Sequence, residues 1–166
     1  MTEPEPIKSS RIDDHIEQAL CDADEGDIAL VREALYDPRD RWYGQLVASV
    51  YDSLSDQQDL DSVLPATAAI ELLRGYARLR SRLLVRLTDN RAHSLTMDPT
   101  SAVLAGEFLY SAAFSSLRSA PDIRSGDCFE ILTPALETIT KAFARTYTAA
   151  NSADQHTEKF FYETAG

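Results

Sequence analysis

The chain has 166 residues, and its 27 acidic against 16 basic residues give a net charge of −11. This length suits one domain with one hydrophobic core, and the acidic balance excludes general nucleic-acid binding, which requires a basic surface. No apolar run approaches the roughly 18 residues of a membrane span, so no span is expected. The acidic, Pro-containing first residues are unlike a secretory signal, so a cytoplasmic location is predicted.

Residue choice within the charged and metal-binding classes is informative. Only three of the basic residues are Lys, and such an acidic, Lys-poor surface is typical of proteins from extreme halophiles. The three His residues and the cysteines Cys21 and Cys128 show no metal-ligand spacing. We therefore predict no metal site and two buried free thiols.

Helical spacing of apolar residues dominates the first half of the chain. Residues 1–9 are expected to be a disordered lead, and a first helix follows from Ser10. Gly26-Asp27 separates it from a short second helix that ends at Leu35. A third helix is predicted over 39–54, and a polar linker follows it. The apolar face of the third helix comprises Trp42, Leu46, Val47, Val50, Tyr51 and Leu54. Trp42 and Tyr43 are expected to be core or interface anchors.

Three further helices are predicted in the second half. The fourth and longest spans about 65–87. Asp98-Pro99 marks the start of the fifth, because it combines an acidic N-cap with Pro at the first helical position. The sixth is predicted over 127–148, followed by a tail over 151–166. The pattern therefore predicts an all-α, single helical bundle domain over 10–150.

A row of arginines recurs every four residues along the fourth helix: Arg74, Arg78, Arg82 and Arg86. This spacing places them along one side of a helix. Guanidinium groups suit phosphates and carboxylates, so the row is a candidate contact for an anion or an acidic partner. The alternative is a solvated face whose arginines pair with Glu71 and neighbouring acids.

Two sequence blocks about thirty residues apart suggest a family. The first is Ala68-Ala69-Ile70-Glu71-Leu72-Leu73, and the second is Ala102-Val103-Leu104-Ala105-Gly106-Glu107-Phe108-Leu109, followed by Ala112-Ala113-Phe114. Together they resemble the polyprenyl synthetase family. A weaker likeness upstream involves Ala34-Leu35, Arg41 and Leu46-Val47. The resemblance implies a shortened isoprenoid-synthase helical fold over roughly residues 30–120.

The chain departs from the family where the chemistry should lie. In active members an Asp-rich motif holds the magnesium ions that bind the allylic diphosphate. That motif would fall on Ser81-Arg82-Leu83-Leu84-Val85, which contains no carboxylate. Of the basic pair that binds the homoallylic diphosphate, only Arg41 has a counterpart. We therefore predict no catalytic residues and no cofactor, with magnesium required only if the chain is an enzyme after all.

The resemblance thus implies a non-catalytic, degenerate member of the family. Such a protein would bind an isoprenoid diphosphate through Arg41 and the arginine row, or serve a synthase as an accessory subunit in isoprenoid biosynthesis. Because family members generally dimerise, a homodimer or a heterodimer with a full-length prenyl synthase is expected. Two alternatives stay open: a helical interaction module unrelated to isoprenoids, and a divergent prenyltransferase.

Overall fold

The computed structural model describes residues 9–21, 25–36, 41–54, 59–88, 98–121 and 124–164, without the side chains of 25–28, 86–88, 125 and 150–164. These segments contain six helices and no strand. The helices are α1 (Ser9–Leu20), α2 (Glu25–Leu35), α3 (Trp42–Leu54), α4 (Leu64–Thr88), α5 (Pro99–Ser119) and α6 (Ser125–Thr164). The all-α prediction is therefore confirmed.

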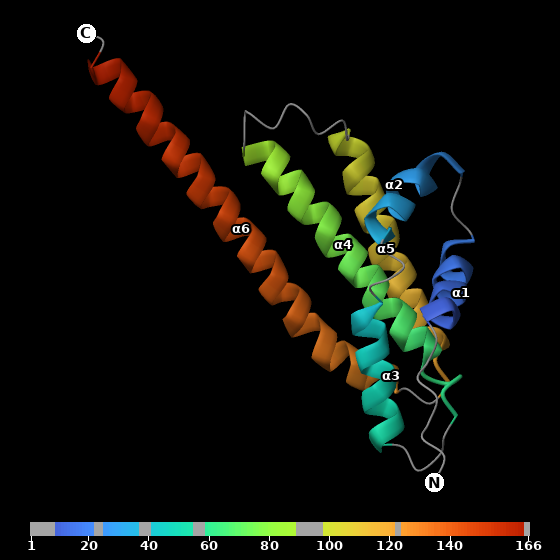
Figure 1. Ribbon diagram of the computed structural model, residues 1–166. Coiled ribbons are helices and arrows are strands. Elements are labelled where there is room, and N and C mark those ends of the chain that lie inside the picture. The colour runs from blue at the N-terminus through green and yellow to red at the C-terminus, as the bar shows by residue number, and fades with distance from the viewer. Residues whose placement is uncertain are drawn as a thin grey trace.

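Helix α4 is the central element of a single bundle (Figure 1). It packs most extensively on α5 and also contacts α1, α2, α3 and α6. In Figure 1, α4 lies between α5 and α6, and the C-terminal part of α6 extends past the end of α4. The core is formed where α1, α2, α4 and α5 meet, and its large members include Ile12, Ile16, Leu20, Val31, Leu35, Leu72, Leu79 and Leu109.

The predicted start of α5 is confirmed in detail. Asp98 is the N-cap, and its side chain accepts hydrogen bonds from the Ser101 backbone N–H at 2.7 Å and from the Ser101 hydroxyl at 3.0 Å. Pro99 follows in the first turn, where its missing N–H leaves no hydrogen bond unmade. The sequence therefore predicts this boundary because cap chemistry is local.

The end of the chain differs from the expectation. Helix α6 continues to Thr164, so most of the predicted tail over 151–166 is helical. Polar composition suggested a tail, but polar composition does not by itself end a helix. At the other end, the predicted lead over 1–9 lies outside the described residues except for Ser9, which begins α1.

Only part of the predicted apolar face of α3 turns to the core, because Val47 and Tyr51 pack against it while Trp42, Leu46, Val50 and Leu54 are exposed. Gly44 and Ala48 are its buried residues. A Cβ atom on Gly44 would lie 3.2 Å from the Thr67 carbonyl oxygen of α4, so the two backbones approach closely there. Small residues permit this approach, whereas the bulky apolar side chains of α3 do not. Most of those bulky side chains therefore remain outside the core.

None of the helices, within the part of the chain that the structure describes, combines the length and apolar character needed to cross a membrane.

Candidate functional site

Arg41 occupies a structural position between α1 and α2. Its side chain is only 8% exposed. Its Nε donates a 2.7 Å hydrogen bond to Asp13 Oδ1, and its Nη1 donates a 3.0 Å hydrogen bond to the Leu35 carbonyl at the end of α2. Arg41 thereby supplies a hydrogen-bond donor to a backbone carbonyl at the C-terminus of α2 and links α1 to that end of α2. These contacts favour a role in the fold over the predicted diphosphate contact.

Substituting Arg41 tests whether its role is in the stability of the fold or in binding a diphosphate. We expect Arg41→Ala to lower the free energy of unfolding by about 2 kcal/mol, because two hydrogen bonds from a charged group are lost. Arg78→Ala, in the arginine row, should change it by no more than about 0.5 kcal/mol. Urea unfolding followed by circular dichroism measures both. Equal, small effects would contradict a structural role for Arg41.

The arginine row lies on one side of α4, as predicted, but two of its members are engaged by acids. Arg74 Nη1 donates to Glu71 Oε2 at 3.2 Å, and its guanidinium lies 5.6 Å from the ring centre of Tyr43. Arg82 pairs with Glu33 of α2 at 2.9 Å. Arg78 is half-buried and forms no ion pair with another described residue. Arg86 lies in α4, and its side chain is outside the described set.

The row therefore agrees in part with both interpretations. Arg82 pairs with Glu33 in an exposed ion pair, as expected of a solvated face, whereas the Glu71 partner of Arg74 is buried. Arg41 lies apart from the row in its own contacts with α1 and α2. Arg78 remains available to a ligand or partner. A diphosphate site built from all five predicted arginines is not what the geometry favours, because Arg41 is committed elsewhere.

A row of exposed apolar side chains on α3 is the most unusual surface feature. Trp42, Leu46, Val50 and Leu54 recur on successive turns, and they are 57%, 44%, 48% and 80% exposed. We call these four residues the α3 row. Within the described surface they form one side of a helix with no element packed over it. Contiguous exposed apolar surface of this kind marks an interaction site more often than chance.

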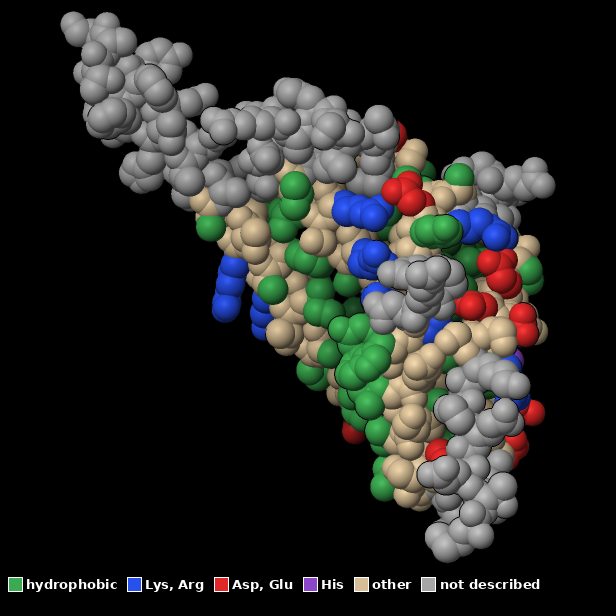
Figure 2. Space-filling view, viewed as in Figure 1, with side chains coloured by type: hydrophobic (Ala, Val, Ile, Leu, Met, Phe, Trp, Pro, Cys, Tyr) green, Lys and Arg blue, Asp and Glu red, His purple; other side chains and the backbone are tan. Residues whose placement is uncertain are grey.

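The α3 row continues into a cavity between α4 and α6. Tyr43 stands next to Trp42, with their rings edge to face at 5.4 Å, and it lines this cavity of about 250 Å³. Arg74 is the charged side chain of the lining, and the other members are Ile70, Leu73, Ala77, Leu132, Ala135, Leu136 and Ile139. Figure 2 shows hydrophobic side chains gathered along the α4–α6 seam and down the edge of α3.

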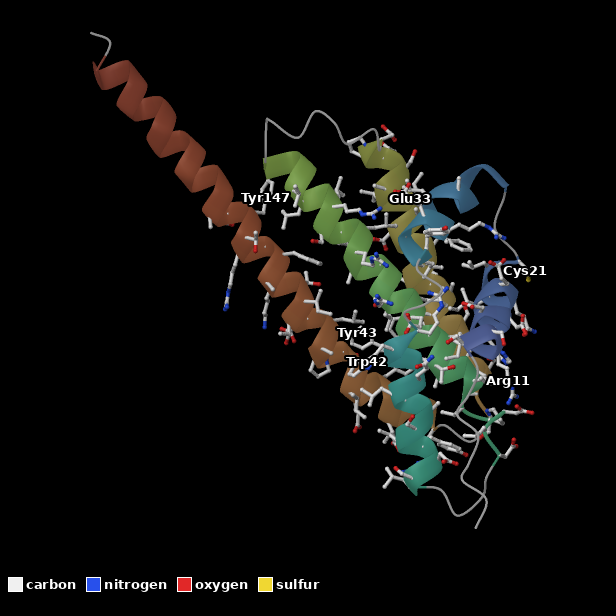
Figure 3. All side chains as sticks on the ribbon, in the orientation of Figure 1. Arg11, Cys21, Glu33, Trp42, Tyr43 and Tyr147 are labelled. Atoms are coloured by element: carbon white, nitrogen blue, oxygen red, sulfur yellow. The ribbon has the colours of Figure 1, made fainter. Side chains whose placement is uncertain are left out.

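A second cavity of about 320 Å³ lies further along the same two helices. Its lining includes the aromatic residues Tyr76, Phe143 and Tyr147 together with Arg80. Figure 3 shows Tyr147 on α6 near the far end of α4, and Trp42 and Tyr43 at the start of α3. The two cavities indicate that α6 packs on α4 with gaps, so the seam retains room for further side chains.

Neither the candidate metal ligands nor the thiols of the described residues form a catalytic or metal site. Within the described segments, no three His, Cys, Asp or Glu residues lie close enough to hold a metal ion. Neither Cys21 nor Cys128 forms a disulfide within the described residues, but the predicted burial is wrong: Cys21 is exposed and Cys128 is half-buried. Desolvation and the neighbouring Asp127 carboxylate raise the pKa of the Cys128 thiol. A raised pKa lowers the thiolate fraction, so Cys128 is poorly suited to nucleophilic chemistry.

Comparisons with known proteins add no relative. The chain matches no protein-family model, no curated protein and no solved structure. The polyprenyl synthetase resemblance therefore stays a prediction that rests on its sequence blocks.

Proposed function

We propose that this chain is a non-catalytic helical module that acts by binding another protein through the α3 row and the adjoining cavity. The exposure of Trp42, Leu46, Val50 and Leu54 on one side of α3 carries this proposal. Burying large apolar side chains is the main driving force for association, and Trp and Tyr often dominate interface energetics. If the family resemblance holds, a full-length prenyl synthase is the expected partner, and this chain is its accessory subunit.

The test compares two exposed leucines. Leu46 belongs to the α3 row, whereas Leu104 is 58% exposed on α5. Leu46→Asp and Leu104→Asp should both leave the free energy of unfolding within about 0.5 kcal/mol of the parent, because neither side chain is buried. A photoreactive amino acid at position 50 should crosslink one partner in cells. That crosslink should be lost in Leu46→Asp and kept in Leu104→Asp.

Two results would overturn the proposal. One is a crosslinking pattern that is indifferent to Leu46→Asp, since the α3 row would then not form the contact. The other is magnesium-dependent consumption of isopentenyl and allylic diphosphates by the purified chain, abolished by a chelator. That activity would favour the divergent prenyltransferase instead.

A second candidate function is binding of an isoprenoid diphosphate without turnover. The observation that favours it is the apolar cavity with Arg74 in its wall, because an apolar chain and an anionic head could occupy such a site together. Farnesyl and geranylgeranyl diphosphate should then raise the thermal midpoint without magnesium. At one hundred times its dissociation constant, a ligand adds about 2.7 kcal/mol to the free energy of unfolding. Absence of any shift would remove this candidate.

A further inference from the structure

The apolar surface adjoins a row of arginines on α4. Arg74 lines the cavity, and Arg78 and Arg82 occupy the next two turns of α4. Figure 2 shows basic side chains in a line over α4 directly beside the hydrophobic strip. The α3 row itself contains no charged residue. Arg74 lies against the Tyr43 ring, whereas Arg82 pairs with Glu33 of α2, past the Trp42 end of the α3 row (Figure 3). A partner that covers the α3 row therefore meets these arginines at one end of the row.

These arginines can receive new acceptors. Arg78 has no ion pair within the described chain, and a guanidinium carries five N–H donors in a planar fork that matches a carboxylate. The Arg82–Glu33 pair is exposed, with side chains 38% and 62% accessible. Exposed pairs contribute little, so a carboxylate from a partner can displace Glu33. Arg78 and Arg82 are therefore suited to bind the carboxylates of a partner.

We infer that the partner presents an amphipathic helix whose apolar side covers the α3 row and whose flanking Asp or Glu residues contact Arg78 and Arg82. This inference rests on the proposed interaction function. Apolar residues at successive turns of such a helix would enter the cavity beside Tyr43 and cover the α3 row from Trp42 to Leu54. The flanking acids would fix its orientation, because charge complementarity sets register and excludes partners of the wrong sign.

The net charge of −11 does not prevent this contact. Salt screens exposed charges beyond about 8 Å at physiological ionic strength, so groups at the contact decide the sign. A second copy of the chain is a poorer occupant. An isologous contact sets one surface against itself, and the α3 row offers no acid to meet the copy's Arg78. An acidic helix from a different protein satisfies both the α3 row and the arginines at its end.

The experiment uses the whole chain and a displayed library of 20-residue peptides. Each peptide carries Leu or Ile at helical spacing, and its flanking positions are randomised. Peptides selected for binding should be enriched in Asp and Glu at one end, beside the apolar residues, relative to the unselected library. Enrichment in Lys and Arg, or no charge preference, would overturn the acidic-helix inference while leaving the interaction function standing. Failure of any peptide to bind would overturn the inference as well.

Trp42 provides the quantitative readout, because it is the only Trp of the chain and lies in the surface itself. A selected peptide should shift its fluorescence to shorter wavelength with a saturable dose dependence. Arg78→Glu should weaken this binding at least tenfold and improve binding of a charge-reversed peptide. Arg118→Glu, on the exposed end of α5, is the matched control and should bind as the parent does.

Leu46→Asp separates the role of the α3 row from the role of the arginines. Loss of binding in Leu46→Asp together with an unchanged affinity in Arg78→Glu would overturn the acidic partner but support the α3 surface. Unchanged binding in Leu46→Asp would overturn both. Concentration-dependent self-association that Leu46→Asp abolishes, without peptide binding, would identify a second copy as the occupant and overturn the acidic-helix inference.

Discussion

Replacing Glu71 by Ala is expected to lower the free energy of unfolding by about 3 kcal/mol, at the lower end of the range for breaking a buried ion pair. Glu71 is only 1% exposed. Its Oε1 accepts a 2.9 Å hydrogen bond from the Gly44 N–H in the first turn of α3, and its Oε2 accepts from Arg74 at 3.2 Å. The carboxylate therefore caps the positive end of α3 from a neighbouring helix. Its removal leaves a buried N–H without an acceptor.

Glu71→Gln isolates the charge contribution in this arrangement. Gln keeps an oxygen for the Gly44 N–H and loses the charge, so roughly half of the Ala effect is expected. Glu33→Ala is the matched control, since Glu33 pairs with Arg82 in an exposed ion pair and should contribute at most about 1 kcal/mol. Equilibrium urea unfolding of the three variants gives the comparison. Similar losses in Glu71→Ala and Glu33→Ala would show that the carboxylate does not cap α3.

Local signals in the sequence were sufficient to predict the helices. Six helices were expected and six are observed in the described segments, because each shows its own apolar period or cap. Asp98-Pro99 predicted the start of α5 from two adjacent residues. The sixth helix was expected to end near Thr148 and continues to Thr164, because polar composition does not by itself end a helix.

The role of each arginine could not be predicted in the same way. The four-residue spacing correctly predicted that Arg74, Arg78 and Arg82 share a side of α4. Their partners depend on tertiary packing: Arg82 meets an acid 49 residues away, and Arg41 meets one 28 residues away. Such pairs join elements whose relative placement no local pattern contains. Arg41 was therefore expected at an anion site, although it is bound to Asp13 and to the end of α2.

The candidate interaction surface was present in the sequence but could not be assigned there. The spacing of Trp42, Leu46, Val50 and Leu54 identified one apolar side of α3, and such a side normally faces the core. Periodicity reports that a helix has an apolar side, not what covers it. Gly44 was the residue that could have signalled the difference. A Gly opposite a bulky row indicates that another backbone approaches on the Gly side.

The close approach at Gly44 leads to the second large prediction. Gly44→Val is expected to lower the free energy of unfolding by about 2 to 3 kcal/mol, because extra atoms must enter a filled space. A Cβ atom there would lie 3.1 Å from Ile12 Cδ1 and 3.2 Å from the Thr67 carbonyl oxygen. The Ile12 side chain can change its rotamer, whereas the Thr67 oxygen belongs to the backbone of α4. The contact with Thr67 is therefore relieved only if α3 moves away from α4. Gly44→Ala should show the same loss on a smaller scale.

Gly106→Ala is the matched control, because its Cβ would meet only Tyr76 at an ordinary 3.6 Å. Ala favours a helix over Gly by about 1 kcal/mol, so Gly106→Ala should be neutral or stabilising. Opposite signs for the two Gly→Ala variants are therefore expected in thermal and urea unfolding. Displacement of α3 in Gly44→Val should also change the fluorescence of Trp42, two residues away. If Gly44→Ala proves as stabilising as Gly106→Ala, α3 does not approach α4 this closely, and its apolar row has room to turn inward.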